Sequence, residues 1–342
     1  MMLRKLWPAL AATLALSGSA GAAAAATPAW PSGFGNYEVG HEYEHLLADE
    51  AHYLHRPTPV FTSFYVQHGS LAEATAALSG KASLWSQLAR AKIRIAQTVP
   101  LVMAGDAGSI AKILSPSDPL HGRYLAFWSG LGKGLHDAGA VAPVLRLGHE
   151  MNLATGYPWS YGNPALRASD FVALYKLAAD AIRARAPDAV RGWNPGKRTA
   201  KGQPEDLWPG DRYVDVVLLD WYDNGTYGFV TSDAAWNTLA HKTNANGPVG
   251  IYPWYELARA HKKPFGVPEW GLTGPRKASR TPTDRPLYIR KMHDFFVQVR
   301  GNLMLESYYN WDQIGSGAHQ LYPVLPTHVQ SSRLYQQLFG RP

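Results

Sequence analysis

The run Val141-Ala-Pro-Val-Leu-Arg-Leu147 leads directly into Gly148-His-Glu-Met-Asn152, so an apolar segment of strand length ends at a carboxylate. A second run, Lys263-Pro-Phe-Gly-Val-Pro-Glu-Trp-Gly271, repeats this arrangement later in the chain, with Glu269 near its end. Short apolar runs bounded by Gly and Pro are typical of buried strands. We therefore expect Glu150 and Glu269 to lie at the ends of two strands.

Strand-like and helix-like segments alternate along the chain. Apolar residues recur at spacings of three and four in the segments 71–91, 120–136, 170–184 and 285–299, which predicts surface helices. Eight strands are expected, at 36–39, 59–65, 93–102, 141–147, 190–193, 214–219, 264–267 and 303–309. Eight strands that alternate with helices close into an α/β (β/α)8 barrel, the TIM barrel, with its site at the carboxyl ends of the strands. Both glutamates are thus predicted to lie on one rim.

Side chains alternate along a strand, which predicts which of them point into the barrel. If Glu150 faces the barrel mouth, Arg146 points inward with it. A buried guanidinium needs an acidic or carbonyl partner, so we expect Arg146 to tie the floor of the site together rather than to react. The same count places Glu269, Val267 and Phe265 on one side of their strand.

Length and composition favour one domain with a secretory signal. The chain has 342 residues, 46% of them apolar, and barrels of this size often form a single domain. Residues 1–26 combine Arg4 and Lys5 with an apolar stretch and small residues up to Ala26, the layout of a signal peptide. We expect cleavage near Ala26, a mature barrel domain over residues 27–342, and export to the periplasm or the medium.

The residue content excludes several classes of function. The chain has no cysteine, which rules out disulfides, thiolate metal sites and thiol nucleophiles. Its net charge of +7 falls to +5 without Arg4 and Lys5, and the scattered excess does not favour nucleic-acid binding. The positive balance would suit an acidic polysaccharide, although a solubilising surface is the simpler explanation. We expect a monomer without metal, organic cofactor or membrane insertion.

Paired carboxylates at one rim indicate a retaining glycosidase. One carboxyl is protonated and donates to the leaving oxygen, while the other is ionised and attacks the anomeric carbon. The 12 Trp and 18 Tyr fit this hypothesis, because the apolar face of a sugar packs on aromatic rings, although most of them are expected in the core. A polysaccharide or oligosaccharide is therefore the expected partner.

The motifs resemble glycoside hydrolase family 26, which is best known for secreted β-mannanases of clan A with a (β/α)8 fold. Arg146-Leu-Gly-His-Glu-Met-Asn152, followed by Tyr157-Pro-Trp159, is similar to the acid/base segment of that family. Further similarities to its first, fifth, sixth and nucleophile strands follow in order, at Gly35-Asn-Tyr-Glu-Val-Gly40, Trp193-Asn-Pro195, Leu219-Asp-Trp-Tyr222 and Glu269-Trp-Gly271.

The resemblance implies a role for several residues of these motifs. Glu150 would be the acid/base and Glu269 the nucleophile, with the hydroxyl of Tyr222 as a donor to it. The residues implied to contact the sugar are His149, Asn152, Trp159, Trp193, Tyr222, Trp270 and Trp311. Endo-cleavage of a β-1,4-mannan is the implied activity, and depolymerisation of another β-linked exopolysaccharide, neutral or acidic, is the alternative. Taken alone, Trp159, Trp270 and Trp311 are better explained by packing than by sugar contact, and Asn152 is explained by contacts to loop backbone.

Two other classes of protein stay open. The segment His41-Glu42-Tyr-Glu-His45 has the spacing of zinc peptidases, in which two imidazoles on one helical face bind Zn²⁺. Against this, Glu44 places a charge where such a helix packs, and no third histidine follows at the expected spacing. A non-catalytic sugar-binding barrel would need the aromatic cleft but neither Glu150 nor Glu269.

Overall fold

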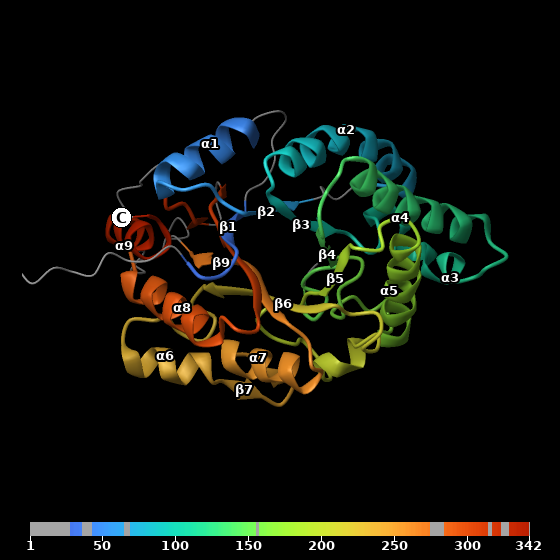
Figure 1. Ribbon diagram of the computed structural model, residues 1–342. Helices are drawn as coiled ribbons and strands as arrows, with labels where there is room; N and C mark the ends of the chain where they lie inside the picture. Colours follow the sequence, from blue (N-terminus) through green and yellow to red (C-terminus); the bar gives the residue numbers. More distant parts are fainter. Residues whose placement is uncertain are drawn as a thin grey trace, which may run out of the picture.

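The structure is a computed structural model, and it describes residues 28–35, 43–64, 69–154, 157–273, 284–313, 317–322 and 328–341. Eight parallel strands within these residues form a closed barrel, which helices surround (Figure 1). The strands are β1 (Ser32–Gly35), β2 (Val60–Phe64), β3 (Arg94–Val99), β4 (Val144–Leu147), β5 (Val190–Trp193), β6 (Val216–Asp223), β9 (Phe265–Leu272) and β10 (Leu303–Tyr309). Their order around the barrel is β1-β10-β9-β6-β5-β4-β3-β2, which confirms the predicted single-domain (β/α)8 fold.

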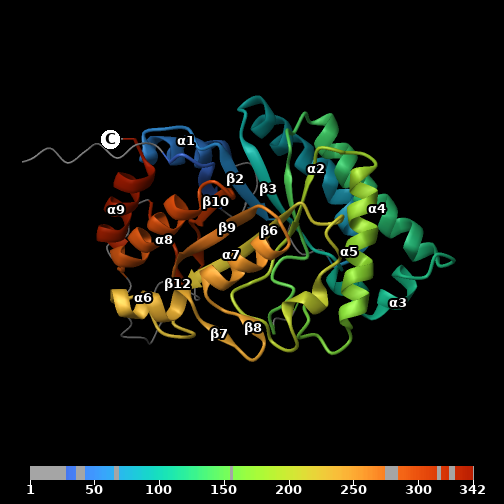
Figure 2. The ribbon, with the colours of Figure 1, turned by 60° about the horizontal axis from the view of Figure 1, so that its bottom comes forward.

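The α-helices of the described chain follow the expected alternation with the strands, except between β5 and β6, where only a short 3-10 helix, Pro204–Leu207, is found. They are α1 (Tyr43–Leu54), α2 (Leu71–Arg90), α3 (Ile110–Ile113), α4 (Pro119–Asp137), α5 (Ala168–Arg183), α6 (Asp233–Ala240), α7 (Ile251–Ala260), α8 (Pro286–Val299) and α9 (Val329–Phe339). Short hairpins pair β7 (Thr243–Asn244) with β8 (Gly247–Pro248) and β11 (Asp312–Gln313) with β12 (Gly317–Ala318). In Figure 2, α4 and α5 pack along one flank of the barrel, while α8 and α9 pack on the opposite flank.

Local signals in the sequence explain where the two longest helices begin. The hydroxyl of Ser70 accepts from the backbone N–H of Glu73, whose carboxylate accepts from the N–H of Ser70, so α2 starts in a capping box. At α4 the carboxylate of Asp118 caps the N-terminus, and Pro119 occupies the first turn, where its missing N–H costs nothing. No helix in the described ranges is long and apolar enough to cross a bilayer.

The expected and observed strands differ at the first strand and at β6 and β9. The first strand is β1 at Ser32–Gly35, whereas the segment expected for it, 36–39, lies outside the described residues. The strands β6 and β9 run further than expected, because they pair with each other from Asp220 opposite Glu269 to Asp223 opposite Leu272. This extension carries side chains of the candidate site above the apolar part of the barrel.

The interior of the barrel changes from apolar to polar toward the carboxyl ends of the strands. An apolar cluster fills the lower interior and consists of Val60, Ala96, Val144, Val216, Leu218 and Leu305. In this cluster Ala96 of β3 lies beside Val144 of β4. Two residues further along both strands, Thr98 lies beside Arg146. Since both of these upper side chains are completely or almost completely buried, the rim of the barrel is built on a dry polar layer.

Candidate active site

The segment that carries Glu150 turns sharply at the end of β4. Gly148 has φ +56°, and a Cβ there would lie 2.9 Å from the Cβ of Leu101, so this position requires glycine. Glu150 has φ +54°, an unfavourable conformation for a residue with a side chain. Its N–H donates to the carbonyl of Asn194 at 2.7 Å, which anchors the turn to the end of β5.

A β-bulge in β9 turns Glu269 toward the barrel interior. Between two paired positions, Gly266 opposite Leu218 and Glu269 opposite Asp220, β9 advances by three residues and β6 by two. Before this bulge Val267 packs in the outer core between strands and helices, and after it Glu269 faces inward. The predicted side-chain alternation, with Glu269, Val267 and Phe265 on one side, is therefore wrong, because the extra residue reverses its phase.

Arg146 is the centre of the polar floor, as its inward position in β4 predicts. Its Nε donates to Oδ1 of Asn194 at 2.6 Å, and its Nη2 donates to Oδ2 of Asp220 at 2.5 Å and to Oε2 of Glu269 at 2.8 Å. Burial alone would lower the pKa of Arg146, but the charges of Asp220 and Glu269 outweigh it and raise the pKa. One permanently charged guanidinium thus links three strands beneath the cleft.

The carboxylate of Glu269 is held at both oxygens. The hydroxyl of Tyr222 donates to its Oε1 at 2.6 Å, while Arg146 occupies Oε2. Burial, followed by the charge of Glu269, raises the pKa of Tyr222 well above its usual value, so the phenol stays protonated and can donate. Both donors stabilise a negative charge on Glu269, and the hydrogen bond from Tyr222 is the contact that the resemblance implied.

Glu150 lies in the opposite electrostatic situation. Burial and then the negative charge of Glu269 raise the pKa of Glu150 to about 8, although Arg146 acts in the opposite direction. Its carboxyl forms no hydrogen bond with any other side chain or backbone group of the described residues. At neutral pH Glu150 is therefore mostly protonated, and the proton points to no internal acceptor.

A cleft with a volume of about 200 Å³ opens above these groups. The loops that follow β4, β5 and β6 form its walls. The residues that line it are Glu150, Leu153, Ala154, Lys197, Arg198, Asp220, Tyr222, Asn224, Thr226 and Tyr227. Burial raises the pKa of Asp220 well above its usual value, and the neighbouring acids add to this, while the ion pair with Arg146 opposes it.

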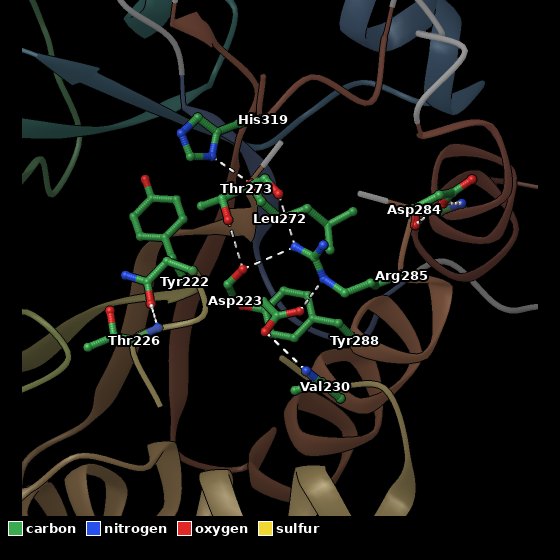
Figure 3. Close-up of polar contacts among 12 residues, drawn as sticks. Tyr222, Asp223, Thr226, Val230, Leu272, Thr273, Asp284, Arg285, Tyr288 and His319 are labelled. Carbon is green, nitrogen blue, oxygen red and sulfur yellow. Dashed lines mark hydrogen bonds and ion pairs between the residues drawn. The ribbon is translucent and has the colours of Figure 1, made fainter. Parts of the chain in front are cut away.

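An ion pair fixes the loop that follows β6. The Nε of Arg285 donates to Oδ2 of Asp223 at 2.6 Å, and both side chains are buried (Figure 3). The other oxygen, Oδ1 of Asp223, accepts from the N–H of Val230 at 3.2 Å, and the carbonyl of Asp223 accepts from the hydroxyl of Thr273 at 2.9 Å. These contacts hold both ends of the segment 224–230. Asn224, Thr226 and Tyr227 of this segment line the cleft.

His149 and Trp159 lie behind the cleft as a stacked group with Tyr157. The rings of Tyr157 and Trp159 are parallel with centroids 4.7 Å apart, and Nε1 of Trp159 donates to the carbonyl of His149 at 2.8 Å. Trp159 is almost fully buried, so it supports Tyr157 and His149 from behind instead of facing a ligand. Burial and the charge of Arg146 lower the pKa of His149 well below its usual value, so its ring is neutral.

Trp193 and Trp270 are core residues and do not reach the cleft. Both are completely buried on the outer face of their strands. Nε1 of Trp193 donates to the carbonyl of Leu207 at 3.0 Å, and Nε1 of Trp270 donates to Oε2 of Glu306 at 2.7 Å. Their predicted sugar contacts are corrected here, because alternation turns Trp193 outward and the bulge that points Glu269 inward points its neighbour outward.

Asn152 and Trp311 are also placed away from the cleft lining. The amide of Asn152 is completely buried and exchanges two hydrogen bonds with the backbone of Gly196, at 2.7 and 2.9 Å, which ties the loop after β4 to the loop after β5. Asn152 therefore satisfies loop backbone, as its residue type alone indicated. Trp311 is half-buried just beyond β10, where its carbonyl accepts from the N–H of His319 at 3.1 Å.

Several cleft residues were not predicted from the sequence. These are Lys197 and Arg198 after β5, and Asn224, Thr226 and Tyr227 after β6. Their position shortly after two predicted strands is the one signal that marks them, since residues at carboxyl ends of barrel strands face the site. No periodicity or motif distinguishes them from other loop residues.

The structure does not test the zinc hypothesis at its own motif. The side chains of His41, Glu42 and His45 lie outside the described residues. In the part of the chain that is described, no group of three His, Cys, Asp or Glu side chains is arranged to hold a metal ion. Residues 1–26, for which a signal peptide is predicted, lie outside the described residues as well.

Comparison with known proteins identifies the fold. No family model matches the chain, and no curated protein matches its sequence. Among solved structures it is similar to the catalytic domain of a family 26 endo-β-1,4-mannanase from Bacillus sp. JAMB-750, with a TM-score of 0.63, 15% identity, and coverage of 90% of this chain and 86% of that chain. The Bacillus subtilis mannanase BCman matches with a TM-score of 0.58, 19% identity, and coverage of 90% and 84%.

A modular endo-β-1,4-mannanase from Cellulomonas fimi matches with a TM-score of 0.60 and 18% identity, over 90% of this chain and 70% of that chain. The chain therefore has the (β/α)8 fold that structures of family 26 glycoside hydrolases share. At identities this low, the fold is what these comparisons establish.

Proposed function

We propose that this protein is a retaining β-glycoside hydrolase of family 26 that cleaves a polysaccharide, with Glu269 as nucleophile and Glu150 as acid/base. The observation that carries the proposal is the contrast between the two carboxyls. Glu269 accepts from Arg146 and Tyr222, whereas Glu150 is unbonded and has its pKa raised to about 8. Opposite protonation states of two carboxyls in one cleft are the requirement of this chemistry.

The proposed reaction has two steps. In the first, an oxygen of Glu269 attacks the anomeric carbon while Glu150 transfers its proton to the glycosidic oxygen, so the leaving sugar departs as a neutral alcohol. Attack removes the negative charge from Glu269 and lowers the pKa of Glu150, which is now ionised. In the second step Glu150 takes a proton from water, the resulting hydroxide attacks the anomeric carbon, and Glu269 leaves with its charge restored.

The neighbouring residues support this cycle. The hydroxyl of Tyr222 stays protonated and donates to Oε1 of Glu269, so one oxygen is oriented before attack. Arg146 stabilises the carboxylate when it is released in the second step. His149 is neutral, so it places no cation beside the acid.

A β-1,4-mannan is the first substrate that we propose, and another β-linked exopolysaccharide is the second. The mannan rests on the motifs around Glu150 and on the names of the similar structures, several of which are endo-β-1,4-mannanases. Release of reducing ends from a panel of mannans, xylans and exopolysaccharides tests the choice. NMR of the first-formed product tests the mechanism, because retention requires the same anomeric configuration as in the substrate and inversion would overturn the role of Glu269.

We also propose export, on the basis of residues 1–26. N-terminal sequencing of the protein recovered outside the cytoplasm should begin near position 27. The other two classes are tested in the same assays. A sugar-binding barrel would bind but not release reducing ends, and a zinc peptidase would cleave a protein substrate in a manner abolished by a chelator.

A further inference from the structure

Two cationic side chains line the cleft without carboxylate partners. Lys197 and Arg198 lie four and five residues beyond the end of β5, and both belong to the cleft wall. Neither forms an ion pair with a carboxylate of the described residues, whereas the buried Arg146 and Arg285 both do. The wall after β5 therefore carries two positive charges that the described protein does not neutralise locally.

Lys197 is unusual because it is only 7% exposed. Its ammonium donates to the carbonyl of Tyr222 at 2.9 Å and lies 4.9 Å from the ring centroid of Trp221, which leaves donors free toward the cleft. The nearby acid, Asp223, is already engaged by Arg285 at 2.6 Å. Burial lowers the pKa of Lys197 to about 8, and the charge of Asp223 opposes this effect. An anion bound in the cleft would stabilise the charged form of Lys197 further.

The acids of the cleft do not supply that anion. Glu269 shares its charge with Arg146, and Glu150 is mostly protonated at neutral pH. The pKa of Asp220 is raised, and its one bonded oxygen faces Arg146. Arg198 is exposed and makes no polar contact within the described chain, so its guanidinium is available to a ligand.

A third cation lies near the same wall. The ammonium of Lys242 is 5.2 Å from the ring centroid of Tyr227, a half-buried residue that lines the cleft. Aromatic rings with cations beside them suit a sugar ring that carries a carboxylate, because the ring packs on the aromatic face and the anion meets the charges. A neutral mannan has no group that would need Lys197 and Arg198.

We propose that Lys197 and Arg198 form a subsite for a carboxylate-bearing sugar, which favours an acidic form of the second proposed substrate, a β-linked exopolysaccharide, over the neutral β-1,4-mannan. This proposal deepens the proposed glycosidase function and rests on it. The carboxylate could belong to a uronic acid of the backbone or to an acid attached to a hydroxyl. Both sources share the chemistry of a carboxylate held by an ammonium and a guanidinium.

A matched set of probes from one backbone separates these sources. Konjac glucomannan provides the neutral chain, partial oxidation at C6 converts it to a uronate chain, and succinylation adds carboxylates on hydroxyls. For the full chain, kcat/KM at low ionic strength should be about tenfold or more higher on at least one acidic form than on the neutral form, since one hydrogen-bonded charge pair discriminates by this amount. Preference for the oxidised or the succinylated form identifies the source.

Two variants and a control assign the preference to the subsite. Arg198→Gln changes an exposed residue, so the fold should persist, and the ratio of acidic to neutral kcat/KM should fall by about half of the wild-type preference on a logarithmic scale. The double change Lys197→Met and Arg198→Gln should bring that ratio close to one. Arg333→Gln removes the same charge from an exposed position on α9 and should leave the ratio unchanged. Added salt should reduce the wild-type preference.

The outcomes distinguish this proposal from the proposed function. If neutral glucomannan is hydrolysed as well as both acidic forms and the variants keep that ratio, the subsite is wrong and the hydrolase stands. Calorimetric titration with the oxidised chain covers the opposite case. If no probe is hydrolysed but Arg198→Gln weakens binding of the oxidised chain, the subsite stands and the proposed function is wrong.

Discussion

The two carboxyls at the rim are near enough for the charge of one to raise the pKa of the other, yet the protein treats them in opposite ways. In the second half of β9, Glu269 has a hydrogen-bond donor on each oxygen, one of them the permanently charged Arg146. At the end of β4, Glu150 sits on a strained turn and its carboxyl has no internal donor. Chemically identical groups thus acquire different roles because one carboxyl has a donor on each oxygen and the other, which lines the cleft, has none.

The largest expected effect comes from removing the charge of Glu269, the carboxyl with a donor on each oxygen. Glu269→Gln keeps the shape of the side chain but cannot attack carbon, so kcat should fall on the order of 10⁴-fold or more. Substrate binding, measured by calorimetry, should persist, because the cleft wall is unchanged. Turnover within a few-fold of the wild type would contradict the assignment of the nucleophile.

A smaller loss is expected at Glu150, the carboxyl without an internal donor, and this loss should depend on the leaving group. Glu150→Gln removes the proton donor, which is worth about 10²- to 10⁴-fold on a polysaccharide. An aryl glycoside with a good leaving group needs no proton, so its glycosylation step should be much less affected. Azide, a small anion no longer repelled by a carboxylate, should rescue release of the sugar as a β-glycosyl azide. Equal losses on both substrates without rescue would count against the acid/base role.

Removing one of the two donors to Glu269 should reduce the difference between the two carboxyls. Tyr222→Phe removes the hydrogen bond to Oε1 of Glu269, and a hydrogen bond to a charged group is worth roughly 10- to 100-fold in rate. Because Arg146 still holds the other oxygen, the fold and the melting temperature should change little. A kcat indistinguishable from the wild type would show that this contact does not contribute to the reaction.

The smallest effect concerns pH and sharpens the comparison. Since the pKa of Glu150 is raised to about 8, the acid form is present below that pH, and kcat/KM should fall about tenfold per unit above it. In Glu269→Gln the pKa of Glu150 should move down, because one of its causes, the neighbouring charge, has been removed. Carbon-detected NMR of the Glu150 carboxyl measures this directly, and an unchanged or higher value would mean that the two groups do not interact.

The fold was accessible to sequence analysis because its signals are local. Apolar runs mark seven of the eight barrel strands within a few residues, and spacings of three and four mark α2, α4, α5 and α8. The inward direction of Arg146 also followed from its place two residues beyond Val144 in a regular strand. Regular elements repeat the same backbone geometry, so residue position predicts side-chain direction.

The aromatic part of the site was predicted less well. Trp193 and Trp270 neighbour inward-facing residues, and alternation therefore turns both rings into the outer core. The residues that do line the cleft, among them Lys197, Arg198 and Tyr227, lie in loops whose path depends on distant contacts such as the pair between Asp223 and Arg285. Nothing in their own neighbourhood of sequence encodes that path.

The sequence by itself determined the number and order of the strands and placed two glutamates at strand ends, because those properties depend on periodicities within a few residues. Only the tertiary structure decided the direction of Glu269, since the bulge in β9 exists through its pairing with β6 and β10. The same is true of the protonation of Glu150, which follows from burial and from a charge contributed by a strand far away in sequence. The electrostatic environment of a group depends on its distances in space to other charges, and only the folded barrel defines those distances.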